Sequence, residues 1–81
     1  MTFPLFSRVI LCVDLPEEQL MAGDIGTIVE HHPATAAYPE GYEDEFFAGN
    51  GETLAVVSIP ATALRQATRE GVLHVRPLVA A

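Results

Sequence analysis

Histidines are the residues in this chain whose type and spacing best suit metal binding. His31 and His32 are adjacent and follow Glu30, while His74 lies near the other end of the chain. In a strand over residues 25–32, neighbouring side chains point to opposite faces, so His31 and His32 cannot easily share one ion. A closed zinc site needs about four ligands. We therefore predict neither a metal site nor a cofactor, with His31, His32 and His74 as the candidates if a metal were bound.

Tyr42 is followed by three consecutive carboxylates, Glu43, Asp44 and Glu45. Paired carboxylates perform acid–base chemistry in glycosidases, where both must face one deep cleft. Strand alternation instead sends Glu43 and Glu45 to one face and Asp44 to the other. A chain of 81 residues also has little room for such a cleft. We interpret this cluster as a solvated strand face whose charge deters edge pairing.

Motifs for nucleophilic catalysis and phosphate binding are missing from the sequence. Ser7 and Ser58 have no neighbouring base in a nucleophile motif, and the chain contains no Gly-x-x-x-x-Gly-Lys loop. We predict that the protein is not an enzyme.

The only cysteine, Cys12, cannot form an internal disulfide, which fits a reducing compartment. The N-terminus lacks the features of a secretory signal, and the apolar run over residues 9–13 is far too short to cross a bilayer. These features predict a cytoplasmic protein.

The charge of the chain excludes two classes of partner. Asp and Glu total 11 against four arginines and no lysine, which gives a formal net charge of −7. No basic residue lies between Arg8 and Arg65. Nucleic acids and anionic membranes are both bound through clustered basic side chains, so neither partner is expected.

The length of 81 residues predicts a single domain spanning residues 1–81. A core of this size rarely supplies more than about 3–5 kcal/mol without a staple or a partner. Self-association is therefore expected as a possible source of added stability.

Apolar periodicity and turn residues divide the chain into short elements. Strands are predicted over residues 5–15, 25–32, 42–48 and 53–59, because each run is rich in β-branched or aromatic residues and ends at turn signals. Good helix formers over residues 61–70, followed by Gly71, predict a short helix. A closing strand is then predicted over residues 72–76, before Pro77.

Two glycine-containing turns position these strands. Gly23 and Gly26 flank Asp24 where the chain needs positive φ or close backbone approach, and we expect Asp24 to order this turn rather than to bind a ligand. Asn50-Gly51 is the strongest hairpin signal in the chain. Together these elements predict a mainly β fold, a small, bent, five-stranded barrel of the SH3-like type with a short helix before the last strand. An open α+β sheet is the alternative.

The order of these segments resembles an uncharacterised family of small bacterial proteins, a DUF4926-like domain of unknown function. The matching segments are Leu15-Pro16-Glu17-Glu18-Gln19-Leu20, Gly23-Asp24-Ile25-Gly26-Thr27-Ile28-Val29-Glu30, Gly41-Tyr42-Glu43-Asp44-Glu45-Phe46 and Gly51-Glu52-Thr53-Leu54-Ala55. The resemblance implies an SH3-like fold over a core of residues 5–65 and brings no activity with it. The C-terminal extension, residues 61–81, departs from the pattern, which leaves either an inserted helix over 61–71 or an added strand over 69–81.

Two functions remain after these exclusions. The first is a non-catalytic protein-interaction module that binds a basic or proline-rich partner, or a second copy through its C-terminal strand. Its contact residues would be an acidic rim and three aromatic side chains: Glu17, Glu18, Asp24, Glu43, Glu45, Tyr38, Tyr42 and Phe47. The second is a small accessory or regulatory subunit of a larger enzyme, with a metal-responsive histidine cluster as one form of it.

Overall fold

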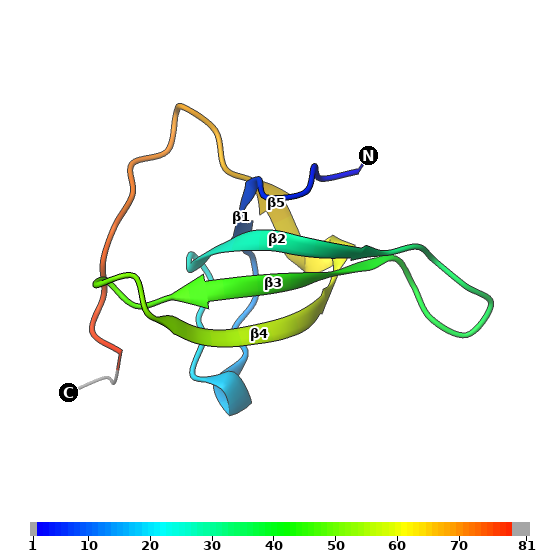
Figure 1. The fold of residues 1–81 in the computed structure, drawn as a ribbon, viewed down its shortest axis with the longest axis horizontal. Coiled ribbons are helices and arrows are strands. Elements are labelled where there is room, and N and C mark those ends of the chain that lie inside the picture. The colour runs from blue at the N-terminus through cyan, green and yellow to red at the C-terminus, as the bar shows by residue number, and fades with distance from the viewer. Residues whose placement is uncertain (1, 79–81) are drawn as a thin grey trace.

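The computed structural model describes residues 2–78, and within them five strands form one antiparallel sheet (Figure 1). The strands are β1 (Arg8–Leu11), β2 (Ile25–His32), β3 (Gly41–Phe47), β4 (Thr53–Pro60) and β5 (Leu64–Gln66). Their order in the sheet is β4-β3-β2-β1-β5, with one-turn 3-10 helices η1 (Pro16–Glu18) and η2 (Ala61–Ala63) in the connections. The sheet is strongly bent and not closed. The mainly β, five-stranded prediction is confirmed.

Most strands begin and end close to the residues predicted from proline positions and from runs of β-branched and aromatic residues. The predicted strand over residues 25–32 is β2, and β4 extends the predicted 53–59 by Pro60. The first strand is much shorter than the predicted 5–15. Phe6 adopts a positive φ of 64°, and the N–H of Cys12 leaves the β1–β2 pairing to donate to the carbonyl of Ala63. The predicted strand therefore begins at a turn around Phe6 and ends in an irregular segment with a bend at Val13.

The predicted helix over residues 61–70 is wrong beyond its first turn. Only η2 is helical, and β5 follows at once and pairs with β1, Leu11 opposite Leu64 and Val9 opposite Gln66. Ala63 and Leu64 are both buried, so burial against the sheet outweighs the modest helix propensity of this segment. An inserted helix over 61–71 is thereby excluded.

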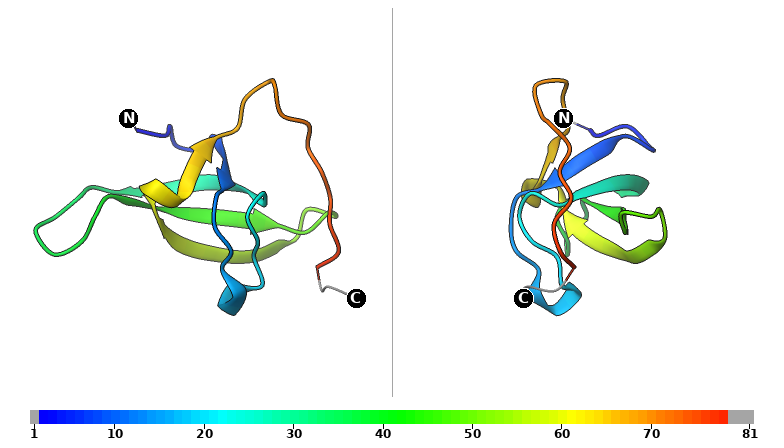
Figure 2. Two further views of the ribbon diagram at one scale, coloured as in Figure 1. Left: turned by 180° about the vertical axis from the view of Figure 1, so that it is seen from behind. Right: turned by 90° about the vertical axis from the view of Figure 1, so that its left-hand side faces the viewer.

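The predicted closing strand over residues 72–76 is also wrong, because the last strand is β5. Residues 67–78 contain neither helix nor strand, so an added strand is absent from residues 69–78, and the rest of the predicted 69–81 lies outside the described residues. The tail, residues 67–78, crosses the end of the sheet beside the β3–β4 hairpin (Figures 1 and 2). Val75 lies next to Gly49 of that hairpin.

The core is built from alternate residues of the strands. Its largest fully buried side chains are Tyr42, Phe46, Leu11, Ile28, Ile59, Val9 and Asp44. The hydroxyl of Tyr42 accepts a hydrogen bond from the N–H of Phe3 at 3.0 Å, and their rings pack 5.2 Å apart. The N-terminal segment is thereby fixed across the sheet.

Both predicted turns form as expected. Gly23 and Gly51 have φ values of +99° and +92°. Gly26 instead allows the ring of Phe46 to approach the backbone closely, because a Cβ at position 26 would lie 3.0 Å from that ring. The Asn50 side chain accepts a hydrogen bond from the N–H of Glu52 at 3.0 Å.

None of the helices in residues 2–78 is long and apolar enough to span a membrane.

Candidate functional site

A groove of about 570 Å³ lies between the β2–β3 loop and the end of β4. Its lining, named here the tyrosine–proline groove, consists of His32, Pro33, Thr35, Tyr38, Pro39, Gly41, Tyr42, Ser58, Ile59 and Pro60. Most of these residues present carbon rather than polar atoms. The groove therefore suits an apolar ligand surface with few hydrogen-bonding groups.

The loop that forms one wall of the groove is held by local hydrogen bonds. The N–H of Thr35 donates to the carbonyl of Tyr38 at 2.8 Å, and the Thr35 hydroxyl accepts from the N–H groups of Ala37 and Tyr38. These bonds close a compact turn that presents the Tyr38 ring, 74 % exposed, at the surface. An ordered loop backbone lowers the conformational entropy that is lost when a partner binds.

The floor of the groove is rigid because it belongs to the core. Tyr42 is fully buried, and the ring of His31 packs against it at 4.9 Å. His31 is in turn hydrogen-bonded to Glu40 at 2.7 Å. Tyr42, expected from the sequence to contact a partner, instead supports the groove from below.

An ionised carboxylate adjoins the groove. The Ser58 hydroxyl donates to Glu43, and His32 Nε2 lies 3.2 Å from the same oxygen. The hydrogen bond from Ser58 lowers the pKa of Glu43 below its ordinary value, against the opposing effect of burial, and His32 lowers it further. Because Ser58 and His32 both line the groove, this negative charge sits at its edge.

The predicted contact residues divide among several places. Tyr38, Tyr42 and Glu43 meet at the groove, whereas Glu45 lies farther along β3 and accepts a hydrogen bond from Thr53 at 2.6 Å. Phe47, at the end of β3, lines a different cavity. Glu17 and Glu18 lie on η1 and line neither cavity. The contact residues predicted from sequence therefore lie in several separate places.

The histidines do not gather into one site. His31 and His32 point to opposite sides of β2, as predicted, and each meets a different glutamate. His74 lies in the tail. Among residues 2–78, no group of three His, Cys, Asp or Glu side chains is placed to hold a metal ion.

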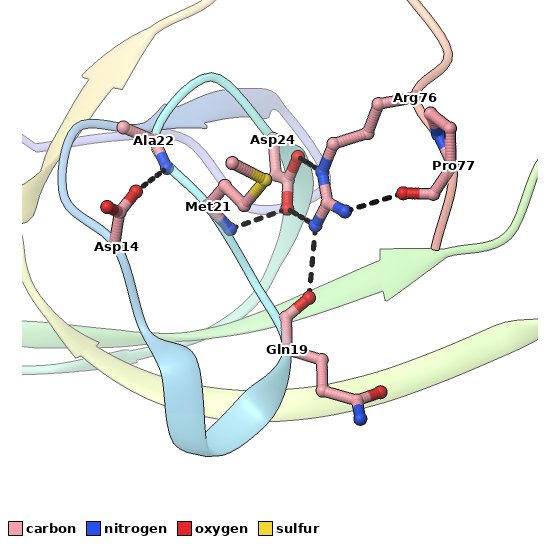
Figure 3. Close-up of polar contacts among 7 residues, drawn as sticks. All are labelled: Asp14, Gln19, Met21, Ala22, Asp24, Arg76 and Pro77. Atoms are coloured by element: carbon pink, nitrogen blue, oxygen red, sulfur yellow. Dashed lines mark hydrogen bonds and ion pairs between the residues drawn. The ribbon is translucent and has the colours of Figure 1, made fainter. Parts of the chain in front are cut away.

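The tail covers a second cavity of about 530 Å³, lined among others by Phe46, Phe47, Leu54 and Leu73. Arg76 anchors the tail there (Figure 3): its Nε and Nη2 donate to the two carboxylate oxygens of Asp24 at 2.8 and 2.7 Å, and Nη2 also donates to the carbonyl of Gln19. Asp24 accepts the N–H of Met21 as well, which orders the turn as predicted. Asp24, expected from the sequence to lie in an acidic rim, pairs with Arg76 of the tail.

The charge state of Asp24 follows from these contacts. Burial acts to raise its pKa, but the hydrogen bonds from Arg76 and from the Met21 N–H, together with the charge of Arg76, outweigh burial and lower it. The interaction is therefore a full ion pair at neutral pH.

Sequence reasoning missed the environment of Asp44. This residue is wholly buried, and neither carboxylate oxygen has a hydrogen-bond partner among the described residues. Burial, with a smaller contribution from the nearby charge of Glu43, raises the pKa of Asp44 to about 7. The signal was present, because alternation places Asp44 on the same face as the core residues Tyr42 and Phe46.

Comparison with known proteins identifies the family. The family model described as "Domain of unknown function (DUF4926)" matches residues 5–66, and the chain belongs to this family. The match ends at the last residue of β5 and does not reach the tail. No curated protein and no solved structure matches the chain.

Proposed function

We propose that this member of the DUF4926 family is a non-catalytic protein-interaction module that binds a basic, proline-containing segment of another protein. The observation that carries the proposal is the tyrosine–proline groove, where an exposed aromatic ring and an ionised carboxylate flank one apolar surface. Its SH3-like character remains part of the proposal, supported by the bent five-stranded sheet.

The lining of the groove favours an extended, proline-containing ligand. Tyr38, Pro39 and Pro60 offer flat, rigid apolar surfaces, which suit the faces of a polyproline II helix. Such a ligand is already extended before it binds, so it loses little conformational entropy.

Charge favours a basic ligand. Glu43 is ionised beside the groove, and the whole chain carries a net charge of −7. An arginine or lysine next to the prolines would pair with Glu43, and the overall field would speed the encounter at low salt.

A cytoplasmic location, the third part of the proposal, rests on the single cysteine.

Calorimetric titration with synthetic peptides tests the proposal. A peptide with prolines flanked by arginine is expected to bind, to bind more weakly as salt is added, and to lose affinity when glutamate replaces arginine. Tyr38→Ala is expected to weaken binding at least roughly tenfold. Glu43→Gln is expected to weaken only the arginine peptide.

Phe6→Ala is the matched control, because Phe6 is as exposed as Tyr38, at 74 %, and does not line the groove. Equal binding of arginine and glutamate peptides, or full affinity in Tyr38→Ala, would refute the proposed site. Recovery of the tagged protein in a stable complex with enzyme subunits would instead favour an accessory or regulatory subunit.

A further inference from the structure

β4 is the long edge strand of the sheet. It pairs with β3 on one side, and no backbone hydrogen bond of the described residues links Thr53–Ile59 to anything on the other side. The opposite edge, β5, spans only Leu64–Gln66 and carries Arg65. Short length and charge protect an edge against pairing, and β4 has neither; its bulge at Leu54 and its proline, Pro60, lie near its two ends and leave the middle of the strand free.

The hydrogen-bond pattern shows which groups of β4 are free. Ala61 donates its N–H to the carbonyl of Glu40, whereas Pro60, opposite Gly41, has no N–H to give. Hydrogen-bonded and non-hydrogen-bonded pairs alternate along an antiparallel ladder, so Ile59 and Val57 bond to β3. The backbone groups of Ser58 and Val56 therefore point to the free edge. The row ends at Val56, because the register with β3 shifts between Phe46 and Phe47 and leaves Leu54 in a β-bulge.

The free edge is also uncharged. Residues 53–64 form the longest run without a charged residue in a chain that carries 11 acids. Val56 lies near the middle of β4 and is 55 % exposed, and Leu54 is 42 % exposed. A basic partner would find no charge to pair with on this strand, whereas a second copy would meet no repulsion from it.

We propose that β4 pairs antiparallel with β4 of a second copy, which gives a two-fold symmetric dimer with one sheet running through both molecules. Placing the two-fold axis at Val56 sets Val56 opposite its own copy, and it sets Leu54 opposite Ser58 of the second copy. The outward-pointing backbone groups of Val56 then meet those of its own copy as a hydrogen-bonded pair, and Ser58 comes opposite the bulged residue Leu54. The strand is thus complementary to itself around Val56, between the bulge at one end and Pro60 at the other.

The acids of β3 do not oppose this pairing. Glu45 is the β3 residue opposite Val56, so the two copies of Glu45 are separated by three strand spacings. At about 4.8 Å a spacing this is roughly 14 Å, beyond the Debye length of about 8 Å at physiological salt. In the same register, Glu52 of the second copy comes opposite Pro60, at the edge of the tyrosine–proline groove.

Sedimentation velocity over a range of protein concentrations tests the dimer. The unmodified protein is expected to shift from monomer to dimer as concentration rises. Val56→Lys places two like charges opposite each other and is expected to weaken dimerisation at least roughly tenfold. Val56→Pro is expected to do the same without removing an internal hydrogen bond, because the Val56 N–H points away from β3.

Val72→Lys is the matched control, since Val72 is 83 % exposed but lies in the tail, and it is expected to dimerise normally. Circular dichroism melting checks that each variant folds. A protein that stays monomeric at every concentration overturns the proposal, and so does a dimer that both Val56 variants leave intact. Peptide binding at the groove is measured separately on the Val56→Lys monomer, so the two proposals can fail independently.

Discussion

At the scale of single residues, the carboxyl group of Asp44 has the least ordinary environment. It faces the core between Ile28 and Val57, fully buried and unpartnered among the described residues, and burial raises its pKa to about 7. In the unfolded chain the same group titrates near 3.8. The folded state therefore holds this proton more tightly. The stability that the protonated Asp44 carboxyl group contributes is complete below pH 3.8 and is lost as pH rises through about 7.

Asp44→Asn should remove this dependence. In urea unfolding, the unmodified protein is expected to be less stable at pH 8 than at pH 4, by up to roughly 4 kcal/mol from this group alone. The Asn variant lacks the ionisable proton and should lose most of that difference. Glu17→Gln on η1 controls for loss of an exposed acid. The same pH slope in Asp44→Asn and in the unmodified protein would contradict the assignment.

Asp24 is expected to make the stability of the folded protein depend on pH in the opposite direction. Its pKa is lowered in the folded state, so the ion pair with Arg76 contributes above the ordinary carboxyl pKa and is lost as pH falls through the lowered value. Arg76→Gln should release the tail and speed amide hydrogen exchange over residues 72–78, a local loss on the order of 1 kcal/mol. Arg69→Gln, also in the tail, is the control. Unchanged exchange in Arg76→Gln would show that apolar contacts alone hold the tail.

At the scale of elements, the close pairing of β2 with β3 depends on the absence of a side chain at Gly26. Gly26 lies opposite Phe46, whose ring would be 3.0 Å from a Cβ at position 26. Gly26→Ala is expected to lower the free energy of unfolding by about 1–3 kcal/mol, measured by chemical denaturation, because the ring must move within a packed core.

Gly49→Ala is the comparison for this substitution, because the nearest atom to a Cβ there is 3.8 Å away. The double variant Gly26→Ala, Phe46→Leu should lose less stability than the two single losses added together. Strict additivity would show that the ring is not the obstacle.

The elements that sequence predicted well are those whose limits are local. Alternation with Pro33 defines β2, and Asn50-Gly51 defines the hairpin that joins β3 to β4. The third strand needed only a shift of one residue, to Gly41–Phe47. β5 was missed because its three residues gain their strand conformation from β1, far away in the sequence, and their local preference is helical.

The candidate site, like the strands, could be predicted from the sequence only where it depends on local residue patterns. Tyr38 and Glu43 could be named from residue type, but their meeting at one groove depends on the β2–β3 loop lying beside Pro60 at the end of β4. The pairing of Asp24 with Arg76 joins residues from distant parts of the chain, and no local pattern encodes it.

At the scale of the whole molecule, the tail and the edge of β4 have separate roles. The family match ends at residue 66, the long free edge of the sheet is β4, and residues 67–78 form no strand. Removal of the tail after residue 68 is therefore expected to leave the fold and self-association intact, while it uncovers the cavity beside Phe47 and Leu54. Light scattering and binding of an apolar fluorescent dye measure these two effects. Loss of self-association on truncation would place the interface in the tail.

The place of β1 in the sheet also governs when the protein can fold. β1 lies between β2 and β5, so the first strand to be synthesised needs the last as a neighbour. A nascent chain on the ribosome can form the β2–β3–β4 meander early, but β1 keeps one edge unpaired until Gln66 has emerged. Sheets completed by such distant pairs fold slowly for their size. Each new chain therefore passes through an interval in which β1 is open to pairing with other nascent strands.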